Sequence, residues 1–397
     1  MYLGRFPPPL TGCKSSPVIL TLLTLLSCLL AGIGILYTLF AATMVAGFGR
    51  QSPPSAARTE PVTILKPLYG AEPRLAENLE SFLDQRWDAP IQLLCGVHSE
   101  RDGAFATVEA LKASRPNADI ACVADGRPHG GNGKVGNLVN MIAAARHDIL
   151  ILSDSDIAVT PDYLDQVVGA LERPDIGAVT CAYHGRGDAG FWSRLGAAGL
   201  SWQFLPNVVV SLALNAGGVC MGSPIALRRA TLDAIGGFER FADILADDHA
   251  IGAAVRELGL EVAVPPMVVT HASADDSLAA LLRHELRWAA TVRQLNPRGY
   301  AGMVVTHPLP FALLTLPLAP TLGFWLTIGT IVARLLMIEN VQRLCRADAA
   351  PIWLLPLRDL LSFAIFLGGF FAGSVDWRGE RLRMEDQGRI SASAETR

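Results

Sequence analysis

Apolar positions are concentrated at the two ends of the chain. Residues 18–48 contain no charged side chain, and a helix needs roughly 20 apolar residues to span a bilayer core. A second uncharged run, residues 308–333, has four prolines in its first half, which predicts a kinked span or a re-entrant segment followed by a span. The third run, residues 360–375, is short, but residues 352–357 extend it if Arg358 snorkels or faces protein. The pattern predicts three spans, with four as the alternative.

Between these runs, short apolar segments alternate with helical stretches. Strands are expected at residues 62–65, 91–97, 120–123, 149–152, 176–181 and 262–264. Helices are expected at residues 73–85, 105–114, 135–146, 161–171 and 247–258. This alternation predicts an α/β domain with a mostly parallel sheet that is covered on both faces. Ligands of such sheets bind at the carboxyl ends of the strands.

Composition agrees with a chain that lies partly in a membrane. Hydrophobic residues make up 51% of the chain and charged residues 18%, whereas soluble domains carry about 25% charged residues. A disordered protein is excluded, and a net charge of −4 argues against nucleic-acid binding. The seven scattered cysteines contain no C-x-x-C, as expected of buried thiols in a reducing compartment.

Charge also predicts the topology. Arginines follow the last apolar run, which favours a cytoplasmic C-terminus and places the central domain in the cytoplasm as well. The expected organisation is an N-terminal tail and transmembrane helix (1–49), a linker (50–60), a cytoplasmic catalytic domain (61–305), a C-terminal transmembrane and interfacial region (306–376), and a basic, then disordered, cytoplasmic tail (377–397).

Two carboxylates, Asp154 and Asp156, follow the strand expected at residues 149–152. Their charges are costly unless they are compensated, and a divalent cation that bridges to a diphosphate is a natural partner. Hard oxygen ligands suit Mg²⁺ or Mn²⁺. The alternative is an Asx turn and helix cap before Pro161.

Other charged groups open the expected helices. Residues 130–134 form a glycine-rich loop that fails the Walker A pattern, yet it delivers Lys134 and a helix N-terminus to an anionic ligand. A simple turn before a helix is the alternative. Asp247 and Asp248 open another helix; we expect Asp247 to cap it and Asp248 to face the cleft as a general base.

The segment His284-Glu285-Leu286-Arg287-Trp288 precedes the second apolar run on a helix-like stretch. His284 and Arg287 are three residues apart and share one helical face. The fork of an arginine suits a diphosphate. An Arg/Trp anchor at the lipid interface is the alternative.

Taken in order, these motifs resemble those of membrane-bound glycosyltransferases of the GT-A fold, and in particular the ceramide glucosyltransferase family, family 21. The family pattern is matched by Lys66-Pro67-Leu68-Tyr69-Gly70, Asn137-Leu138, Asp154-Ser155-Asp156, Asp248 and Arg287-Trp288. Within the family, the chain resembles most the bacterial hopanoid-biosynthesis glycosyltransferases, through residues 146–148, 153–157, 245–248, 283–288 and 375–379. The resemblance covers roughly residues 60–380.

The chain departs from the family pattern in two places. His284 replaces the Gln or Arg that opens the last motif, and it can still donate to a phosphate oxygen. Ser99 stands where the family has an aspartate that helps to hold the uridine. Either Glu100 or Asp102 substitutes for that aspartate, or nucleotide affinity is reduced.

The resemblance implies an inverting transfer from a UDP-sugar. Asp154 and Asp156 would hold Mg²⁺ or Mn²⁺, and Asp248 would take the proton of the acceptor hydroxyl. The nucleotide and diphosphate would be bound by Lys66, Lys134, Asp154, His284, Arg287 and Trp288. The apolar stretch of residues 195–214 is either acceptor-facing and interfacial or a buried core helix and strand.

The expected function is the transfer of N-acetylglucosamine or glucose to a hydroxyl of a membrane lipid, most simply a hopanoid, at the bacterial inner membrane. Three alternatives stay open: a sphingolipid glucosyltransferase, a processive polysaccharide synthase, and an inactive subunit that binds a UDP-sugar. Nucleic acid is not an expected partner, and protein partners are not identified by the sequence.

Overall fold

A seven-stranded sheet forms the centre of the molecule. The computed structural model describes residues 17–215, 218, 220–372, 375–377, 380–384 and 390–392. The strand order is β3-β2-β1-β4-β8-β6-β9. The strands are β1 (Val62–Pro67), β2 (Ile91–Val97), β3 (Asp119–Ala124), β4 (Ile149–Leu152), β6 (Ile176–Thr180), β8 (Ile225–Arg228) and β9 (Glu261–Ala263). Only β8 is antiparallel to its neighbours, so the predicted mostly parallel sheet is confirmed, and β8 was missed.

Helices cover both faces of this sheet, as the apolar pattern predicts. They are α2 (Leu75–Leu83), α3 (Gly103–Ser114) and α5 (Tyr163–Leu171) on one face, and α4 (Gly133–Met141), α8 (Arg229–Ala234) and α9 (Asp247–Glu257) on the other. Alternate strand residues point to opposite faces, so Ile64 and Leu65 of β1 belong to different core clusters. The buried apolar runs of the strands therefore hold two helical layers together.

A smaller sheet lies beside the main one. It consists of β5 (Ile157–Ala158), β10 (Val268–Ser273) and β7 (Ala182–Gly187). These strands are short or carry histidine and arginine, so they lack the apolar signal of a buried strand. Their pairing places His271 opposite Ile157, close to the turn that follows β4.

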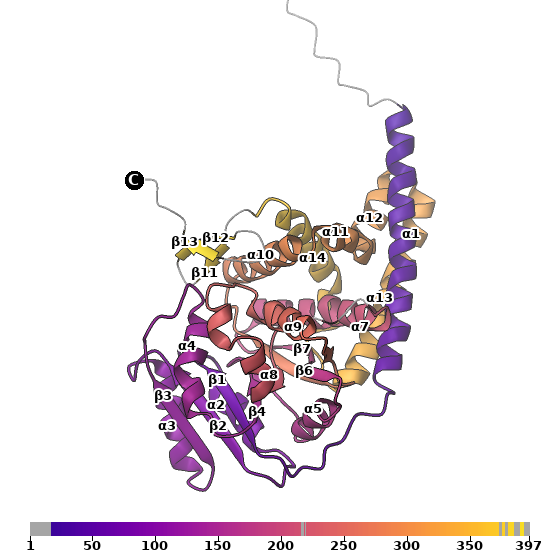
Figure 1. The fold of residues 1–397 in the computed structure, drawn as a ribbon. Helices are drawn as coiled ribbons and strands as arrows, with labels where there is room; N and C mark the ends of the chain where they lie inside the picture. The colour runs from indigo at the N-terminus through magenta and orange to yellow at the C-terminus, as the bar shows by residue number, and fades with distance from the viewer. Residues whose placement is uncertain are drawn as a thin grey trace, which may run out of the picture.

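A buried helical layer separates the sheets from the apolar helices (Figure 1). It is continuous from α6 (Phe191–Gly199) through a π-helical turn, η2 (Leu200–Phe204), to α7 (Leu205–Ala213). Val208 and Val209 of α7 belong to one core cluster with Val45 and Phe48. Of the two interpretations of residues 195–214, the structure supports a buried layer, without the strand.

Four helical stretches of the described chain are long and apolar enough to cross a membrane. They are α1 (Pro17–Phe48), the buried Phe191–Ala213, α13 (Pro320–Cys345), and Ile352–Gly369, which contains α14 (Leu355–Gly369). The uncharged run 308–333 is divided between α12 (Pro308–Leu318) and α13.

The two helices of that divided run pack against α1 in opposite directions. Thr315 of α12 donates to Ser27 of α1 (Oγ1–Oγ 3.0 Å), and Pro308 lies against Gly34, so α12 is antiparallel to α1. Asn340 of α13 donates to the carbonyl of Ala42, further along α1. The chain therefore turns back between α12 and α13 and does not continue as one kinked helix.

The part of the C-terminal tail after Met384 was expected to be disordered, but Ile390–Ala392 within it form a strand. A small sheet joins β11 (Val375–Trp377), β12 (Glu380–Met384) and β13 (Ile390–Ala392). The expectation for residues 385–389 and 393–397 lies outside the described residues. Six cysteines are within the described chain, and all six are free thiols; Cys95, Cys181 and Cys220 are buried as expected, and the other three are half-buried.

Candidate active site

The turn after β4 is built on a buried lysine. Lys66, at the end of β1, is completely buried, and its Nζ donates to Ser153 Oγ and to the Asp154 carbonyl, both at 2.9 Å. The ammonium also lies 3.7 Å from the centre of the Phe82 ring. Burial lowers the pKa of Lys66 to about 7. The structure places Lys66 behind the turn, where it supports Asp154, and not on the exposed side expected of a diphosphate ligand.

The glycine-rich loop is attached to the segment that leads into α9. Asn132 caps α4, because its Oδ1 accepts from the amides of Lys134 and Val135 at 3.1 and 3.2 Å. Its Nδ2 donates to the carbonyl of Ile244 at 2.7 Å. A Cβ at Gly130 would lie 2.6 Å from a backbone oxygen of that segment, so the close approach requires glycine. The loop thereby brings Lys134 to the start of α9.

Lys134 is the cation at the centre of the site. Its Nζ lies 2.9 Å from Asp154 Oδ1 and 3.1 Å from Asp247 Oδ2. Burial by itself would lower the pKa of Lys134, but the two carboxylates raise it above its ordinary value. The prediction that Asp247 caps α9 is wrong: the N-cap is Ala246, and Asp247 lies in the first helical turn and pairs with Lys134 instead.

Asp248 lies next to this ion pair. Burial and the neighbouring Asp247 raise the pKa of Asp248 to about 6, and Lys134 partly opposes the rise. Burial raises the pKa of the Tyr183 hydroxyl, and Asp248, Asp156 and Asp154 raise it further. The charges of carboxylates from two separate motifs therefore act on this one hydroxyl.

Asp156 has the features of a cation ligand. Its Oδ2 lies 3.5 Å from His271 Nε2, whereas its buried Oδ1 has no hydrogen-bond partner within the described part of the chain. Burial and Asp156 raise the pKa of nearby Glu72 to about 7. The described residues contain no group of three or more His, Cys, Asp or Glu side chains arranged to hold a metal. A divalent cation here therefore needs oxygens from its ligand, as a diphosphate would supply.

An aromatic wall extends from these carboxylates toward the apolar helices. Tyr183 stacks on Phe204 of η2 with ring centres 4.5 Å apart, and His271 lies 5.2 Å from Tyr183. Trp288 meets His271 edge-on at 5.9 Å. These rings form a continuous series of contacts from Phe204 of the buried helical layer to His271, which lies beside Asp156.

The predicted helix of the last motif is confirmed as α10 (Leu278–Leu295). His284 Nδ1 lies 3.2 Å from Asp275 Oδ2, and its ring is 4.1 Å from that of Trp288. Arg287, on the same helix, is partly buried. The structure brings Trp288 to the aromatic wall and engages His284 with Asp275, so His284 has one ring nitrogen already occupied.

The three residues considered for uridine binding, Ser99, Glu100 and Asp102, lie between β2 and α3. Asp102 caps α3, and its Oδ1 accepts from the amides of both Ala104 and Gly70 at 2.8 Å. Asp102 therefore holds the loop after β1 against the loop after β2. Ser99 and Glu100 are exposed beside it.

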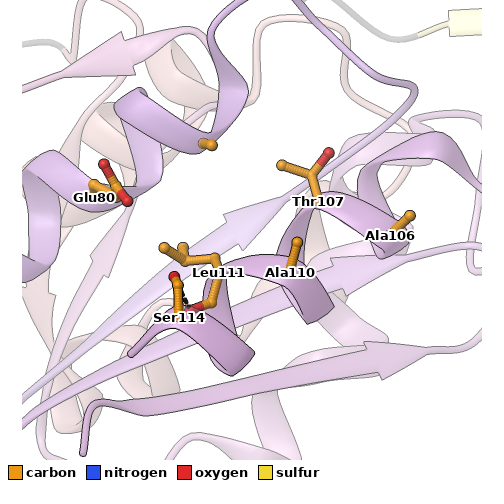
Figure 2. A pocket seen from close by; sticks show the side chains of 7 residues that line it. Glu80, Ala106, Thr107, Ala110, Leu111 and Ser114 are labelled. Atoms are coloured by element: carbon orange, nitrogen blue, oxygen red, sulfur yellow. Dashed lines mark hydrogen bonds between the residues drawn. The ribbon is translucent and has the colours of Figure 1, made fainter. Parts of the chain in front are cut away.

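Sequence reasoning missed Glu72, Tyr183 and His271. His271 and Tyr183 lie on short strands whose polar residues gave no strand signal, and their position follows from long-range pairing. Glu72 could have been predicted from the sequence, because it follows the end of β1 closely and ligands bind at the carboxyl ends of the strands. A separate hollow of about 440 Å³ between α2 and α3 is lined by small side chains together with Leu111 and Glu80 (Figure 2), and it shares no residue with these motifs.

The fold is a glycosyltransferase-like α/β fold. A mannosyltransferase from Pyrobaculum calidifontis, solved in complex with GDP-Man and Mn²⁺, aligns with 88% of this chain and 99% of its own, with a TM-score of 0.53 and 16% identity. The sequence profile of glycosyl transferase family 21 matches residues 25–390. The chain belongs to this family and is a UDP-sugar-dependent glycosyltransferase.

Two relatives from Caenorhabditis elegans show how far the similarity extends. Ceramide glucosyltransferase 1 is 26% identical over 84% of this chain and 73% of its own length. Ceramide glucosyltransferase 3 is 23% identical over 83% of this chain and 74% of its own. The family inferred from the motifs is thereby confirmed.

We predict that Asp248→Asn stabilises the protein at neutral pH. The raised pKa of Asp248 means that its ionised form destabilises the folded state. This cost is complete above about pH 6 and disappears below the ordinary carboxyl pKa of about 3.9. The thermal unfolding midpoint in detergent should rise by a few degrees at pH 7.5, and the gain should shrink by pH 4.5. The matched control is Asp233→Asn, an exposed site; an equal gain in both variants would contradict the electrostatic explanation.

Proposed function

We propose that this protein transfers a sugar from a UDP-sugar to a hydroxyl of a membrane lipid, with inversion at the anomeric carbon. One observation carries the proposal: Asp248, a carboxylate with a raised pKa, lies next to the Lys134 ion pair, and its charge acts on Tyr183, which stacks on Phe204 of the buried helical layer. The site thus joins a place for an anionic donor to a route for an apolar acceptor.

The donor diphosphate would lie between Lys134, the turn of Asp154 and Asp156, and α10 with Arg287. Lys134 sits between two carboxylates, so an arriving diphosphate can take over part of its charge. The unpartnered Oδ1 of Asp156 fits a divalent cation, Mg²⁺ or Mn²⁺, held with Asp154. When bound, this cation would neutralise charge on the departing UDP. Lys66 would act by fixing the turn.

Asp248 would accept the proton of the attacking hydroxyl. A general base works best with a pKa near the operating pH, and the pKa of about 6 keeps Asp248 ionised at neutral pH while it remains a better acceptor than an ordinary aspartate. Asp247 sustains this pKa through its charge and is held in place by Lys134.

The acceptor would enter from the bilayer along η2 and the aromatic wall. The apolar helices and the C-terminal arginines support a membrane location with the catalytic domain on the cytoplasmic side, where nucleotide sugars are made. The sequence motifs that resemble those of hopanoid-biosynthesis glycosyltransferases favour a hopanoid as the acceptor. The ceramide glucosyltransferase relatives favour ceramide as the second candidate.

A UDP-release assay with defined lipids tests this function. Purified protein in nanodiscs is given UDP-glucose or UDP-N-acetylglucosamine with a hydroxylated hopanoid, with ceramide, or with no added lipid, and mass spectrometry follows the lipid. We expect one lipid to gain a hexose or N-acetylhexosamine in step with UDP release. A growing polysaccharide without lipid product would identify a processive synthase, and absence of UDP release with every pair would overturn the proposal.

We predict that Asp248→Asn lowers turnover at least about a hundredfold, since a general base contributes about 10²–10⁴-fold to the rate. The variant keeps the shape of the side chain and should still bind UDP, which calorimetry measures. Asp233→Asn should retain full turnover. Near-normal turnover of Asp248→Asn would remove this residue from the role of base.

We also predict metal dependence. Turnover should be lost in EDTA and recovered with Mn²⁺ or Mg²⁺, and Asp156→Asn should raise the metal concentration needed for half-maximal rate by about tenfold, as is usual when a metal site is impaired. Asp276→Asn, an exposed aspartate, serves as the control. Full turnover in chelator would show that Asp154 and Asp156 act without a cation.

A further inference from the structure

Two arginines in the apolar helices are almost completely buried. Arg334 of α13 and Arg358 of α14 are each 3% exposed. A buried guanidinium in such a helix is costly unless a carboxylate pairs with it. Arg334 pairs with Asp359 through two contacts, Nε–Oδ2 at 3.0 Å and Nη2–Oδ1 at 2.5 Å. This pair joins α13 to α14, and Arg334 Nη1 also donates to the carbonyl of Trp202 in η2 at 2.8 Å.

Arg358 reaches a different part of the catalytic domain, the helix α10. Its Nη1 and Nη2 donate to Oε1 and Oε2 of Glu285 on α10, both at 2.7 Å. Its Nε donates to Ser362 Oγ at 3.0 Å, and Nη1 also lies 3.2 Å from the carbonyl of Leu195 in α6. A bidentate pair of this kind fixes direction as well as distance. Arg358 therefore holds α6, α10 and α14 together.

Glu285 belongs to the same short motif as Arg287 and Trp288. Trp288 meets His271 at 5.9 Å, and His271 lies 3.5 Å from Asp156. Arg358 is therefore connected to the turn that follows β4 through Glu285 and Trp288 of α10 and then through His271. The pair also fixes the rotation of α10 about its own axis, which decides where the side chains of the motif point.

We propose that Arg358 is a positioning residue for the transfer reaction: it holds Glu285, and so it sets the rotation of α10 at which Arg287 faces the donor and Trp288 meets His271. This inference rests on the proposed function. It predicts that the rate of transfer depends on a contact made among the apolar helices. A displacement of about 1 Å in a reacting site costs up to about a hundredfold in rate, so a small rotation of α10 is sufficient.

The test compares Glu285→Gln and Arg358→Gln with Asp359→Asn in nanodiscs. Asp359→Asn removes the charge of the neighbouring buried pair, of the same chemical type and on the same helix, but leaves the bond from Arg334 to the Trp202 carbonyl. It is the control for lost stability. Both α10-pair variants should lower kcat about tenfold or more at saturating UDP-sugar, with the KM for the lipid little changed. Asp359→Asn should keep kcat within about twofold. The double variant Glu285→Gln/Arg358→Gln should be no slower than the single ones, because the two residues act through each other.

Hydrogen exchange of residues 278–295 gives a readout that does not depend on activity. Exchange should be faster in the two α10-pair variants than in Asp359→Asn at matched thermal stability. Equal exchange in the three variants, or equal losses of kcat that follow stability, would overturn the positioning role. If the wild-type protein released no UDP with any lipid, the proposed function would fail, and the exchange experiment alone would decide whether Arg358 sets the position of α10.

Discussion

The ammonium of Lys134 allows carboxylates from distant parts of the chain to lie at one edge of the sheet. Asp154 comes from the turn after β4 and Asp247 from the start of α9, and both contact this ammonium. Without it, the like charges would repel each other, and the pKa of Asp248, which Lys134 lowers, would rise further. The Asn132 cap and its bond to the backbone before α9 hold Lys134 at this point.

The two sheets contribute different kinds of side chain to the site. The main sheet delivers the Lys66-supported turn and the helix starts, whereas the small sheet and η2 supply the aromatic rings that face them. Ionic groups are thus fixed by strand ends, and apolar rings by the helical layer next to α1 and α13. The boundary between a polar donor region and an apolar acceptor region follows from this division.

The sequence predicted the elements whose signal is local. Buried strands such as β4 are apolar runs, and Asp154, Lys134 and Asp248 follow strand ends or open helices, so their convergence was predictable. Pairings that depend on distant segments were not. The antiparallel β8, the small sheet with His271, and the partnership of Asp247 with Lys134 all depend on contacts across long stretches of chain. Lys66 was placed on the correct strand, but its full burial follows from packing on Phe82.

The packing of α7 on α1 and α13 also determines whether the catalytic domain could be stable in water without the apolar helices. Val208 and Val209 are covered by Val45 of α1 and Val341 of α13, and Glu285 obtains its counter-charge from α14. A fragment cut at residue 305 would present that apolar surface to water and leave Glu285 without its guanidinium. The apolar helices at the two ends of the chain are thus part of the structure of the catalytic unit. A water-soluble variant of this enzyme would need a polar surface on α7 and a new partner for Glu285, in addition to the loss of its membrane anchor.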